Sequence, residues 1–393
     1  MSLLFIMPLW SDHAELWMQR MLEAVEPQLA AIGAWDPAEK TWRGRVRTIA
    51  LRPPAPSLIR RTMRRARLPV PSLLGTSAET ILQKAVEDPS VTVVLAHYLE
   101  FALVFQSVWD QTSKPLFVHC HGYDVTWDLR RDGNPDEAYF PGDYVGRVRR
   151  LAGRATLIAN SNTSAQRLFD VGISPEHVRV KYLGVPVPDA PPSRHFRTNG
   201  LEILYLGRLI DCKGPDLVIR AFEEACERGL DAHLTLAGDG VMRTTCELLA
   251  RRSPFSERIR LLGWVDAARG EELRNRADIF TAHNCRGTLS HQEEAYGVSI
   301  VEAMACALPV VSGRNGSLAE TVIHGETGLL VQPWDVSAHA EAFLTLANQP
   351  ELRRRMGEAG WRRAGEVFSS EKERLALLQI LGLPSEGELP PPP

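Results

Sequence analysis

Short apolar runs alternate with amphipathic stretches along most of this 393-residue chain, and this pattern constrains the fold more than any other feature. The runs are rich in Val, Ile and Leu without polar alternation, which is typical of strands buried on both faces. They lie at 3–7, 47–51, 91–96, 115–119 and 156–160, and again at 202–206, 233–237, 259–262, 279–282 and 309–312. Helical patterns lie between many of them, for example at 215–228, 240–253, 270–277 and 298–307. The alternation predicts an α/β protein whose parallel sheets are covered by helices.

The chain is long enough for two cores, and a Pro-rich polar segment divides it near the middle. This segment, 186–200, reads PVPDAPPSRHFRTNG and separates the two series of strands. We predict a first domain over 1–188, a linker over 189–199 and a second domain over 200–365. A helical stretch at 366–381 is expected to pack back on the first domain, and the Pro-rich end at 384–393 is expected to form a flexible tail.

Composition narrows the class of protein. The formal net charge is −3 and 44% of the residues are apolar, so nothing global indicates nucleic-acid binding. The six cysteines never come closer than 14 residues, which excludes a CxxC motif and favours reduced thiols in a cytoplasmic protein. The apolar N-terminus lacks a basic leader and is better interpreted as a buried strand than as a signal peptide. No stretch reaches the roughly 18 apolar residues that span a bilayer.

One local charge feature stands apart. Residues 40–67 carry Lys40 and nine arginines, and no acidic residue occurs from 40 to 78. Within it, LIRRTMRRARL has the pattern of a basic amphipathic helix, which can bind an anionic membrane surface or a phosphorylated ligand. The competing interpretation is a solvated, Arg-rich face without a partner.

The segment HQEEAYGVSIVEAMA at 291–305 combines two carboxylates with a helix start. Gly297 lies where the helix should begin, and the free N–H groups of a helix N-terminus attract phosphate. Glu302 would lie about one turn inside that helix, where a carboxylate can accept hydrogen bonds from the vicinal hydroxyls of a ribose. Glu294 would lie on the loop before it. Taken alone, the same pattern fits an ordinary helix start with two surface glutamates.

A second segment, LYLGRLIDCKGPDLVIRA at 204–221, places two cations after an apolar strand. The strand ends at Gly207, Arg208 follows, Lys213 comes five residues later, and Gly214 opens a helix. Open α/β sheets bind ligands at the carboxyl ends of their strands. Arg as a planar fork and Lys as a point charge together suit a diphosphate, although a surface loop with two cations is the simpler alternative.

These two segments resemble those of the retaining glycosyltransferases of family 4 (glycosyl transferases group 1). That family has the GT-B architecture, in which two Rossmann-like domains with parallel sheets face a central cleft. The matching motifs are GRLIDCKG and EAYGVSIVEAMACALPVVS, followed in family order by LAGDGVMR, LLGWV and AETVIHGETGLLV. The resemblance is close over about 200–335 and weaker at 119–125 (HCHGYDV) and 159–185.

The resemblance implies roles on the donor side. Arg208 and Lys213 would neutralise the diphosphate of a nucleotide sugar, with Gly207 beside them. Backbone amides at Gly297, Val298 and Ser299 would support the phosphate. Glu302 would hold the ribose, and Glu294 would face the donor sugar near its anomeric carbon.

On the side of the first domain, the resemblance implies that His121 reaches toward the donor sugar. His119 is a rival for this role, and either histidine could simply be a satisfied residue at a strand end. Asp124 is expected to order the same loop or to face the sugar. The loop after the first strand departs from the family because it contains no glycine. Trp10, His13 and Trp17 crowd it instead, so we expect acceptor contacts from Trp10 and His13.

The chain contains no Asp-x-Asp pair, which commonly holds a metal ion at such sites. We therefore expect Arg208 and Lys213 to stabilise the leaving group by fixed electrostatics, with no metal or other cofactor. The resemblance implies retention of anomeric configuration, and two domains around a cleft imply hinge closure.

The donor base, the sugar and the acceptor stay open from the sequence. A saccharide, a lipid-linked molecule and a small molecule all fit as acceptor. The basic region favours a lipid-linked or anionic acceptor at the inner membrane face, as in bacterial envelope or exopolysaccharide synthesis. Two alternatives keep the same architecture: a nucleotide-sugar epimerase or hydrolase, and a non-catalytic nucleotide-sugar-binding protein. The absence of GxGxxG after a strand and of a Walker A loop disfavours a nicotinamide oxidoreductase and an ATPase.

Overall fold

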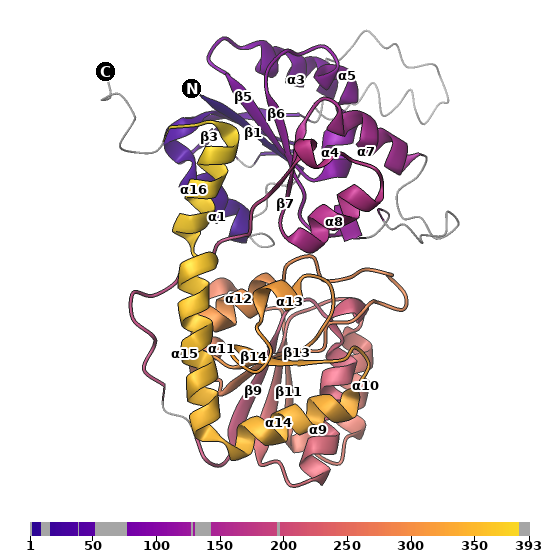
Figure 1. Ribbon diagram of the computed structural model, residues 1–393, viewed down its shortest axis with the longest axis vertical. Coiled ribbons are helices and arrows are strands. Elements are labelled where there is room, and N and C mark those ends of the chain that lie inside the picture. The colour runs from indigo at the N-terminus through magenta and orange to yellow at the C-terminus, as the bar shows by residue number, and fades with distance from the viewer. Residues whose placement is uncertain are drawn as a thin grey trace, which may run out of the picture.

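The chain forms two α/β domains stacked end to end (Figure 1). The structure is a computed structural model that describes residues 2–8, 16–37, 39–51, 77–126, 129, 143–194 and 197–384. Each domain is built on a largely parallel sheet, which confirms the predicted α/β class. The basic helix predicted at 58–68 lies outside the described residues, as do Trp10 and His13.

The first domain has an eight-stranded sheet of order β3-β4-β2-β1-β5-β6-β7-β8. Every neighbouring pair is parallel except the edge pair β3–β4, which is antiparallel. All five residues of β1 and of β5 are buried, as the apolar sequence of β1 and of the first four residues of β5 predicts; the fifth residue of β5 is the buried His97. The strands are β1 Leu3–Met7, β2 Leu29–Ala34, β3 Thr41–Trp42, β4 Val46–Ala50, β5 Val93–His97, β6 Leu116–His119, β7 Thr156–Ala159 and β8 Val178–Val180.

Helices connect these strands, and several begin at side-chain caps. Ser161 accepts a hydrogen bond from the Ser164 amide at the start of α8, and Asp143 accepts one from the Gly146 amide at the start of α7. The described helices are α1 Leu16–Ala24, α3 Ala78–Glu87, α4 Leu99–Val104, α5 Gln106–Trp109, α6 Tyr123–Thr126, α7 Tyr144–Ala152 and α8 Asn162–Asp170.

The second domain has a six-stranded, fully parallel sheet of order β11-β10-β9-β12-β13-β14. Alternate residues of the central strand β9 pack into different hydrophobic cores. Ile203 and Tyr205 pack with one set of helices, whereas Leu204 packs into a core that is continuous with that of the first domain. The strands are β9 Leu201–Leu206, β10 Ala232–Ala237, β11 Ile259–Gly263, β12 Ile279–Ala282, β13 Val310–Gly313 and β14 Gly328–Val331.

Helices cover both faces of this sheet, so its strands need no polar face. They are α9 Pro215–Glu227, α10 Arg243–Arg252, α11 Ala267–Arg276, α12 Val298–Ala305, α13 Leu318–Thr321, α14 Val336–Asn348 and α15 Pro350–Val367. Short 3-10 turns lie at η1 Glu26–Gln28, η3 Pro175–His177, η4 Asp211–Lys213 and η5 Ser256–Arg258.

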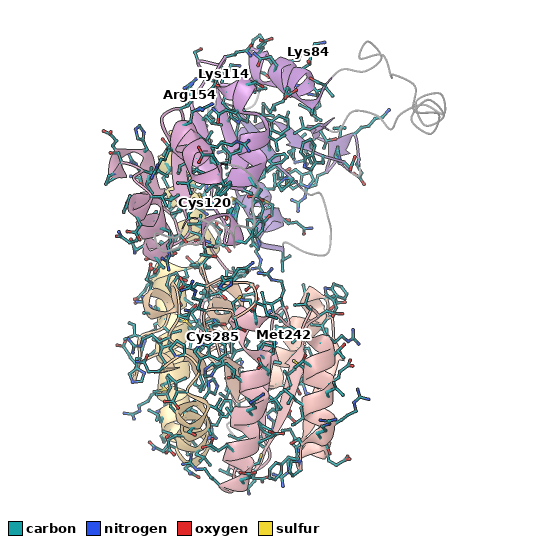
Figure 2. The ribbon with its side chains drawn as sticks, turned by 90° about the vertical axis from the view of Figure 1, so that its right-hand side faces the viewer. Lys84, Lys114, Cys120, Arg154, Met242 and Cys285 are labelled. Carbon is teal, nitrogen blue, oxygen red and sulfur yellow. The ribbon has the colours of Figure 1, made fainter. Side chains whose placement is uncertain are left out.

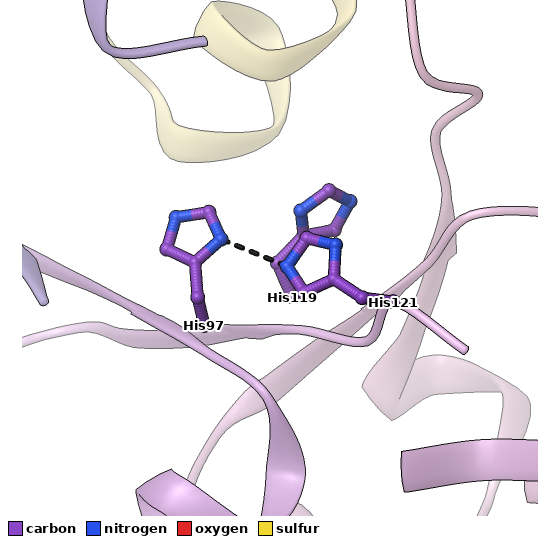
Figure 3. A group of neighbouring side chains, drawn as sticks. All are labelled: His97, His119 and His121. Atoms are coloured by element: carbon purple, nitrogen blue, oxygen red, sulfur yellow. Dashed lines mark hydrogen bonds between the residues drawn. The ribbon is translucent and has the colours of Figure 1, made fainter. Parts of the chain in front are cut away.

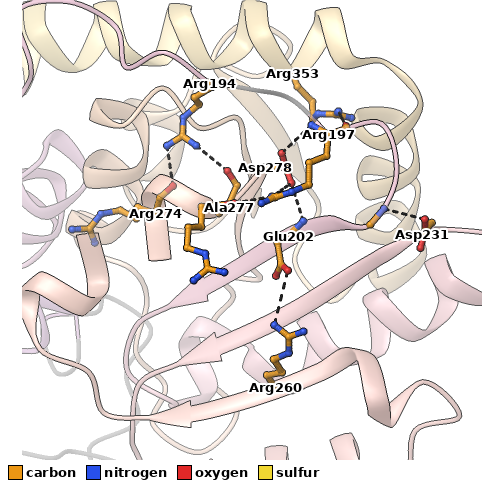
Figure 4. A network of polar contacts seen from close by, with 11 residues as sticks. Arg194, Arg197, Glu202, Asp231, Arg260, Arg274, Ala277, Asp278 and Arg353 are labelled. Carbon is orange, nitrogen blue, oxygen red and sulfur yellow. Dashed lines mark hydrogen bonds and ion pairs between the residues drawn. The ribbon is translucent and has the colours of Figure 1, made fainter. Parts of the chain in front are cut away.

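The chain passes between the domains twice. The linker is fixed to the second domain by arginines: Arg194 donates to three backbone carbonyls, including that of Arg274, and Arg197 pairs with Asp278 (Figure 4). At the C-terminal end, α15 runs along the second domain, and α16 (Ser370–Leu381) then lies against α1 of the first domain (Figure 1). The predicted helix over 366–381 is therefore two helices, because Glu366 belongs to α15.

A buried ion pair anchors this return. Lys181, at the end of β8, pairs with Glu373 of α16, and both side chains are almost fully buried. The Gly184 amide donates to the other oxygen of the same carboxylate. Strong pairing is needed here because an unpaired charge in this position would carry the full cost of desolvation.

All six cysteines are free and five of them are buried; Figure 2 shows Cys120 in the first domain and Cys285 in the second. None of the described helices combines the length and apolar character needed to cross a bilayer.

Candidate active site

A cleft of about 610 Å³ lies between the two domains and is lined by residues from both. The first domain contributes α1 and the segment after β6, and the second contributes loops at the carboxyl ends of its strands and the start of α12. Most of the predicted site residues line this one cleft: Gly207, Arg208, Lys213, Glu294, Gly297, Val298, Ser299, Glu302 and His121.

The cationic wall follows directly from the end of β9. Gly207 and Arg208 come immediately after the strand, and Lys213 ends the turn η4. The backbone at Gly238 packs closely against the backbone at Gly207, since a Cβ on Gly238 would lie 1.9 Å from the Gly207 carbonyl oxygen. Arg208 is exposed to the cleft, whereas Lys213 Nζ donates to Glu294 Oε2 at 2.5 Å.

Glu294 is held in its ionised form. Burial alone would raise the pKa of its carboxyl, but the charge and hydrogen bond of Lys213, followed by the charge of Arg208, keep that pKa below its usual value. Only 12% of the Glu294 side chain is exposed, so its negative charge acts in a partly desolvated cleft. An ionised carboxylate in this setting can stabilise positive charge that develops on a bound substrate.

The start of α12 opens into the same cleft. Gly297 caps the helix with φ +83°, a left-handed conformation that favours glycine, and a Cβ there would lie 2.7 Å from Leu318 Cδ2. Val298 and Ser299 follow as its first residues and also line the cleft. Their free amides, together with the helix dipole, suit an anionic group.

Glu302 lies one turn further along α12 and is already bound by two arginines. Its Oε1 accepts from Arg20 of the first domain at 3.0 Å, and its Oε2 accepts from Arg274 of α11 at 3.2 Å. Neither arginine could be predicted, because nothing in the residues of α1 or α11 marks which side chain faces the cleft.

The first domain forms the opposite wall around His121. The Trp17 ring lies 4.2 Å and the Tyr98 ring 4.6 Å from the imidazole, measured between ring centroids. Tyr98 has a backbone φ of +69°, which is a strained conformation for an aromatic residue at the end of β5. The His121 Nε2 and the His97 Nδ1 are 2.9 Å apart and share a hydrogen bond.

His97, His119 and His121 form the one group of potential metal ligands found among the described residues, with ligand atoms within 4.8 Å of one another (Figure 3). Burial, and then the charge of Lys181 or a neighbouring imidazole, lowers the pKa of all three histidines well below 6.5, so they are neutral near pH 7. Histidines that bind a metal usually donate their second N–H to a carboxylate or carbonyl. In the described part of the chain both ring nitrogens of His119 lack such a partner, and Lys181 adds positive charge nearby. A metal bound here would therefore lack the hydrogen bond that usually orients such a ligand at His119.

Asp124 does not line the cleft, so the expected contact of its side chain with the sugar is wrong. Its side chain is fully buried and accepts hydrogen bonds from the amides of Leu99, His121 and Gly122. Its position matches the other expectation, that it orders the loop carrying His121. His119, the rival candidate, is fully buried and does not line the cleft.

Comparisons with known proteins agree with this geometry. A family model described as "Glycosyl transferases group 1" matches residues 188–363. A GDP-mannose-dependent alpha-(1-6)-phosphatidylinositol monomannoside mannosyltransferase from Mycolicibacterium smegmatis is 30% identical over 279 residues, covering 64% of this chain and 69% of the relative. The chain belongs to the glycosyl transferases group 1 family. A D-inositol 3-phosphate glycosyltransferase from Kribbella flavida is 27% identical to this glycosyltransferase over 306 residues, covering 74% of the chain and 71% of the relative.

Solved structures agree on the fold. HepE from Anabaena in complex with UDP has a TM-score of 0.74 and 18% identity, covering 97% of this glycosyltransferase and 100% of HepE. Sucrose-phosphate synthase from Thermosynechococcus elongatus has a TM-score of 0.73 and 19% identity, covering 97% and 98%. The predicted GT-B architecture and the predicted class of enzyme, a glycosyltransferase, are both confirmed.

Proposed function

We propose that this glycosyltransferase transfers a sugar from a nucleotide-diphosphate donor bound in the interdomain cleft, with retention of configuration and without a divalent metal. The observation that carries the proposal is the convergence of Arg208, Lys213 and the start of α12 on one cleft. Two cations and a helix N-terminus can bind a phosphate, and Glu302, which lines the same cleft, can accept hydrogen bonds from the hydroxyls of the attached ribose.

The chemistry follows from this arrangement. The bond between the anomeric carbon and the diphosphate oxygen breaks, and the electron pair leaves with the nucleoside diphosphate. The acceptor hydroxyl forms the new bond to the same carbon, and its proton is lost to a departing phosphate oxygen. Arg208 and Lys213 stabilise the charge on the leaving group, while ionised Glu294 stabilises positive charge at the anomeric centre. The salt bridge to Lys213 favours this stabilising role over a nucleophilic one for Glu294.

Metal independence rests on the same two cations. A divalent ion in such enzymes neutralises the diphosphate as it leaves, and fixed guanidinium and ammonium groups can supply that charge instead. Retention of configuration rests on the family's chemistry.

For the acceptor we propose a lipid-linked or anionic saccharide at a membrane surface, as in the synthesis of a bacterial envelope or exopolysaccharide. The basic sequence over 40–67 supports this proposal, as does the phosphatidylinositol-based acceptor in the name of the mannosyltransferase relative. Flotation with vesicles tests the membrane step. The protein should float with vesicles that contain phosphatidylglycerol at low salt, and it should dissociate at high salt. Equal binding to neutral vesicles would count against this role for the basic region.

A product assay tests the reaction. The enzyme is incubated in EDTA with UDP-glucose, GDP-mannose or ADP-glucose and with phosphatidylinositol, inositol phosphate or simple saccharides, and products are identified by mass spectrometry and NMR. One donor should yield a glycoside with the configuration of the donor. An inverted product or a strict need for Mg²⁺ or Mn²⁺ would refute those parts of the proposal, and release of free sugar alone would indicate a hydrolase.

A further inference from the structure

Arg20 of α1 extends from the first domain to the proposed ribose site of the second. Its Nη1 lies 3.0 Å from Glu302 Oε1, and the two side chains are only 17% and 16% exposed. The other partner of Glu302, Arg274, is 10% exposed and belongs to the same domain as Glu302. One carboxylate that lines the cleft is therefore held from both domains at once.

The remaining capacity of this carboxylate matches a diol. A carboxylate has about four lone-pair sites on its two oxygens, and the two arginines use one on each oxygen. One acceptor site on each oxygen is left, which suits the adjacent 2′- and 3′-hydroxyls of a ribose. Arg274 lies on α11, in the same domain as Glu302. Arg20 is the partner whose position depends on how the domains meet.

We propose that Arg20 is a positioning residue that fixes Glu302 for recognition of the ribose hydroxyls, so that the donor's ribose site is built from both domains. This inference rests on the proposed function of the cleft. Without Arg20, the carboxylate keeps one anchor and can rotate, and the hydroxyls lose a fixed acceptor. The ribose contribution to donor binding then decreases while the phosphate contribution remains.

A second tie between the domains provides a control. Glu320 of α13 accepts from the amides of Asn162 and Thr163 at the start of α8, at 2.8 and 2.7 Å, and from the Thr163 hydroxyl. Glu320 does not line the cleft. The Glu320→Gln variant therefore weakens the contact between the domains without changing the ribose site.

The test compares nucleotides that differ only in the ribose. Calorimetric titrations use UDP, GDP and ADP, each beside its 2′-deoxy form, on the wild type and on Arg20→Met, Arg20→Lys and Glu320→Gln. A hydrogen bond to a charged acceptor is worth about 10-fold or more in affinity, so the wild type should bind the deoxy form at least that much more weakly. In Arg20→Met this ratio should fall below about 3-fold, because the ribonucleotide weakens and the deoxy form barely changes. Arg20→Lys should restore part of the ratio, and Glu320→Gln should keep it.

The other outcomes are informative. Equal weakening of both nucleotides in a folded Arg20→Met protein would mean that Arg20 contacts phosphate or supports the fold, and it would overturn the inference. Tighter binding of the ribonucleotide would mean that Arg20 competes with the ribose, which also overturns it. A wild type that binds all three nucleotides but does not distinguish the deoxy forms refutes this inference and leaves the proposed function standing. A wild type that binds no nucleotide refutes both.

Discussion

The two walls of the cleft differ in how closely they follow local sequence. In the second domain, a strand end, a glycine-capped helix and the charged residues beside them were predicted from short motifs, and Arg208, Lys213, Glu294 and Glu302 all line the cleft. In the first domain, one predicted histidine lines the cleft and Asp124 lies beneath its wall.

Ligand chemistry explains the difference. A diphosphate and a ribose need backbone amides, cations and a carboxylate at positions that a strand end and a helix start fix within a few residues. The opposite wall depends on side chains brought together from distant segments, such as Trp17, Tyr98 and His121. We therefore expect removal of the cations Arg208 and Lys213 to affect chemistry first, and removal of the buried Asp124 support beneath the opposite wall to affect stability first.

The largest effect should come from removing the two cations. The Arg208→Ala/Lys213→Ala variant should lose about 10³-fold or more in turnover, because the leaving group loses its fixed positive charge. Steady-state kinetics of sugar transfer measure this change. Arg251→Ala, an exposed arginine on α10, is the matched control and should keep its rate. A folded double variant that keeps most of its rate would show that the two cations do not stabilise the leaving group.

On the opposite wall, Asp124→Ala should act on stability. Three backbone amides lose their acceptor inside the protein, and each buried unpaired donor costs about 1–3 kcal/mol, so a loss of about 3 kcal/mol or more is expected. Urea unfolding measures it. Asp124→Asn keeps one acceptor oxygen and should lose less. If Asp124→Ala instead keeps its stability and loses its turnover, Asp124 takes part in the reaction and does not only order the loop that carries His121.

Gly297, which caps α12, can be compared with Gly325, a glycine of the same backbone conformation. Gly297 and Gly325 share φ +83°, but a Cβ on Gly297 meets Leu318 at 2.7 Å whereas a Cβ on Gly325 meets nothing within 4 Å. Both alanine variants should pay about 1–2 kcal/mol of backbone strain, measured by thermal unfolding. Gly297→Ala should lose more than Gly325→Ala and should also bind nucleotide more weakly. Equal losses of stability and equal nucleotide binding in the two variants would show that Gly297 has no particular role at the start of α12.

Acidification should affect the buried histidines. Burial lowers the folded-state pKa of His97, His119 and His121, while an unfolded histidine titrates near 6.5. The unfolded chain therefore binds more protons than the folded chain below that pH, so the contribution of these histidines to stability is constant above about pH 7 and falls as the pH drops. Each histidine should cost about 1 kcal/mol between pH 7 and pH 5.5.

The His119→Leu variant isolates one of these histidines. Its loss of stability over the same pH interval, from urea unfolding at both values, should be smaller than that of the wild type by about 1 kcal/mol. An unchanged pH dependence would show that His119 is already protonated in the folded protein or does not contribute.

Much of the fold could be predicted because buried parallel strands have a distinctive composition. All ten predicted strands match observed strands to within two residues: β1, β4, β5, β6, β7, β9, β10, β11, β12 and β13. The strand β2, LAAIGA, was missed because Ala and Gly give little strand signal, and β14 was missed because it is short and begins with Gly.

The residues of the candidate site also differ in whether the sequence predicts them. Arg20 and Arg274 were not predicted because their role comes from the approach of α1 and α11 to Glu302, which no sequence spacing encodes. The buried ion pair between Lys181 and Glu373 was not predicted either, because it joins residues that are 192 positions apart.

Binding of a nucleotide-diphosphate sugar in the cleft through Arg208 and Lys213 can be measured as ligand-induced thermal stabilisation. UDP-, GDP- and ADP-sugars are added in EDTA to the wild type and to Arg208→Ala/Lys213→Ala. A ligand at one hundred times its Kd should stabilise the wild type by about 2.7 kcal/mol, and the folded double variant should gain far less. Equal stabilisation of both proteins would show that the two cations do not bind the donor, and no stabilisation of the wild type by any of these sugars would show that the cleft is not a donor site.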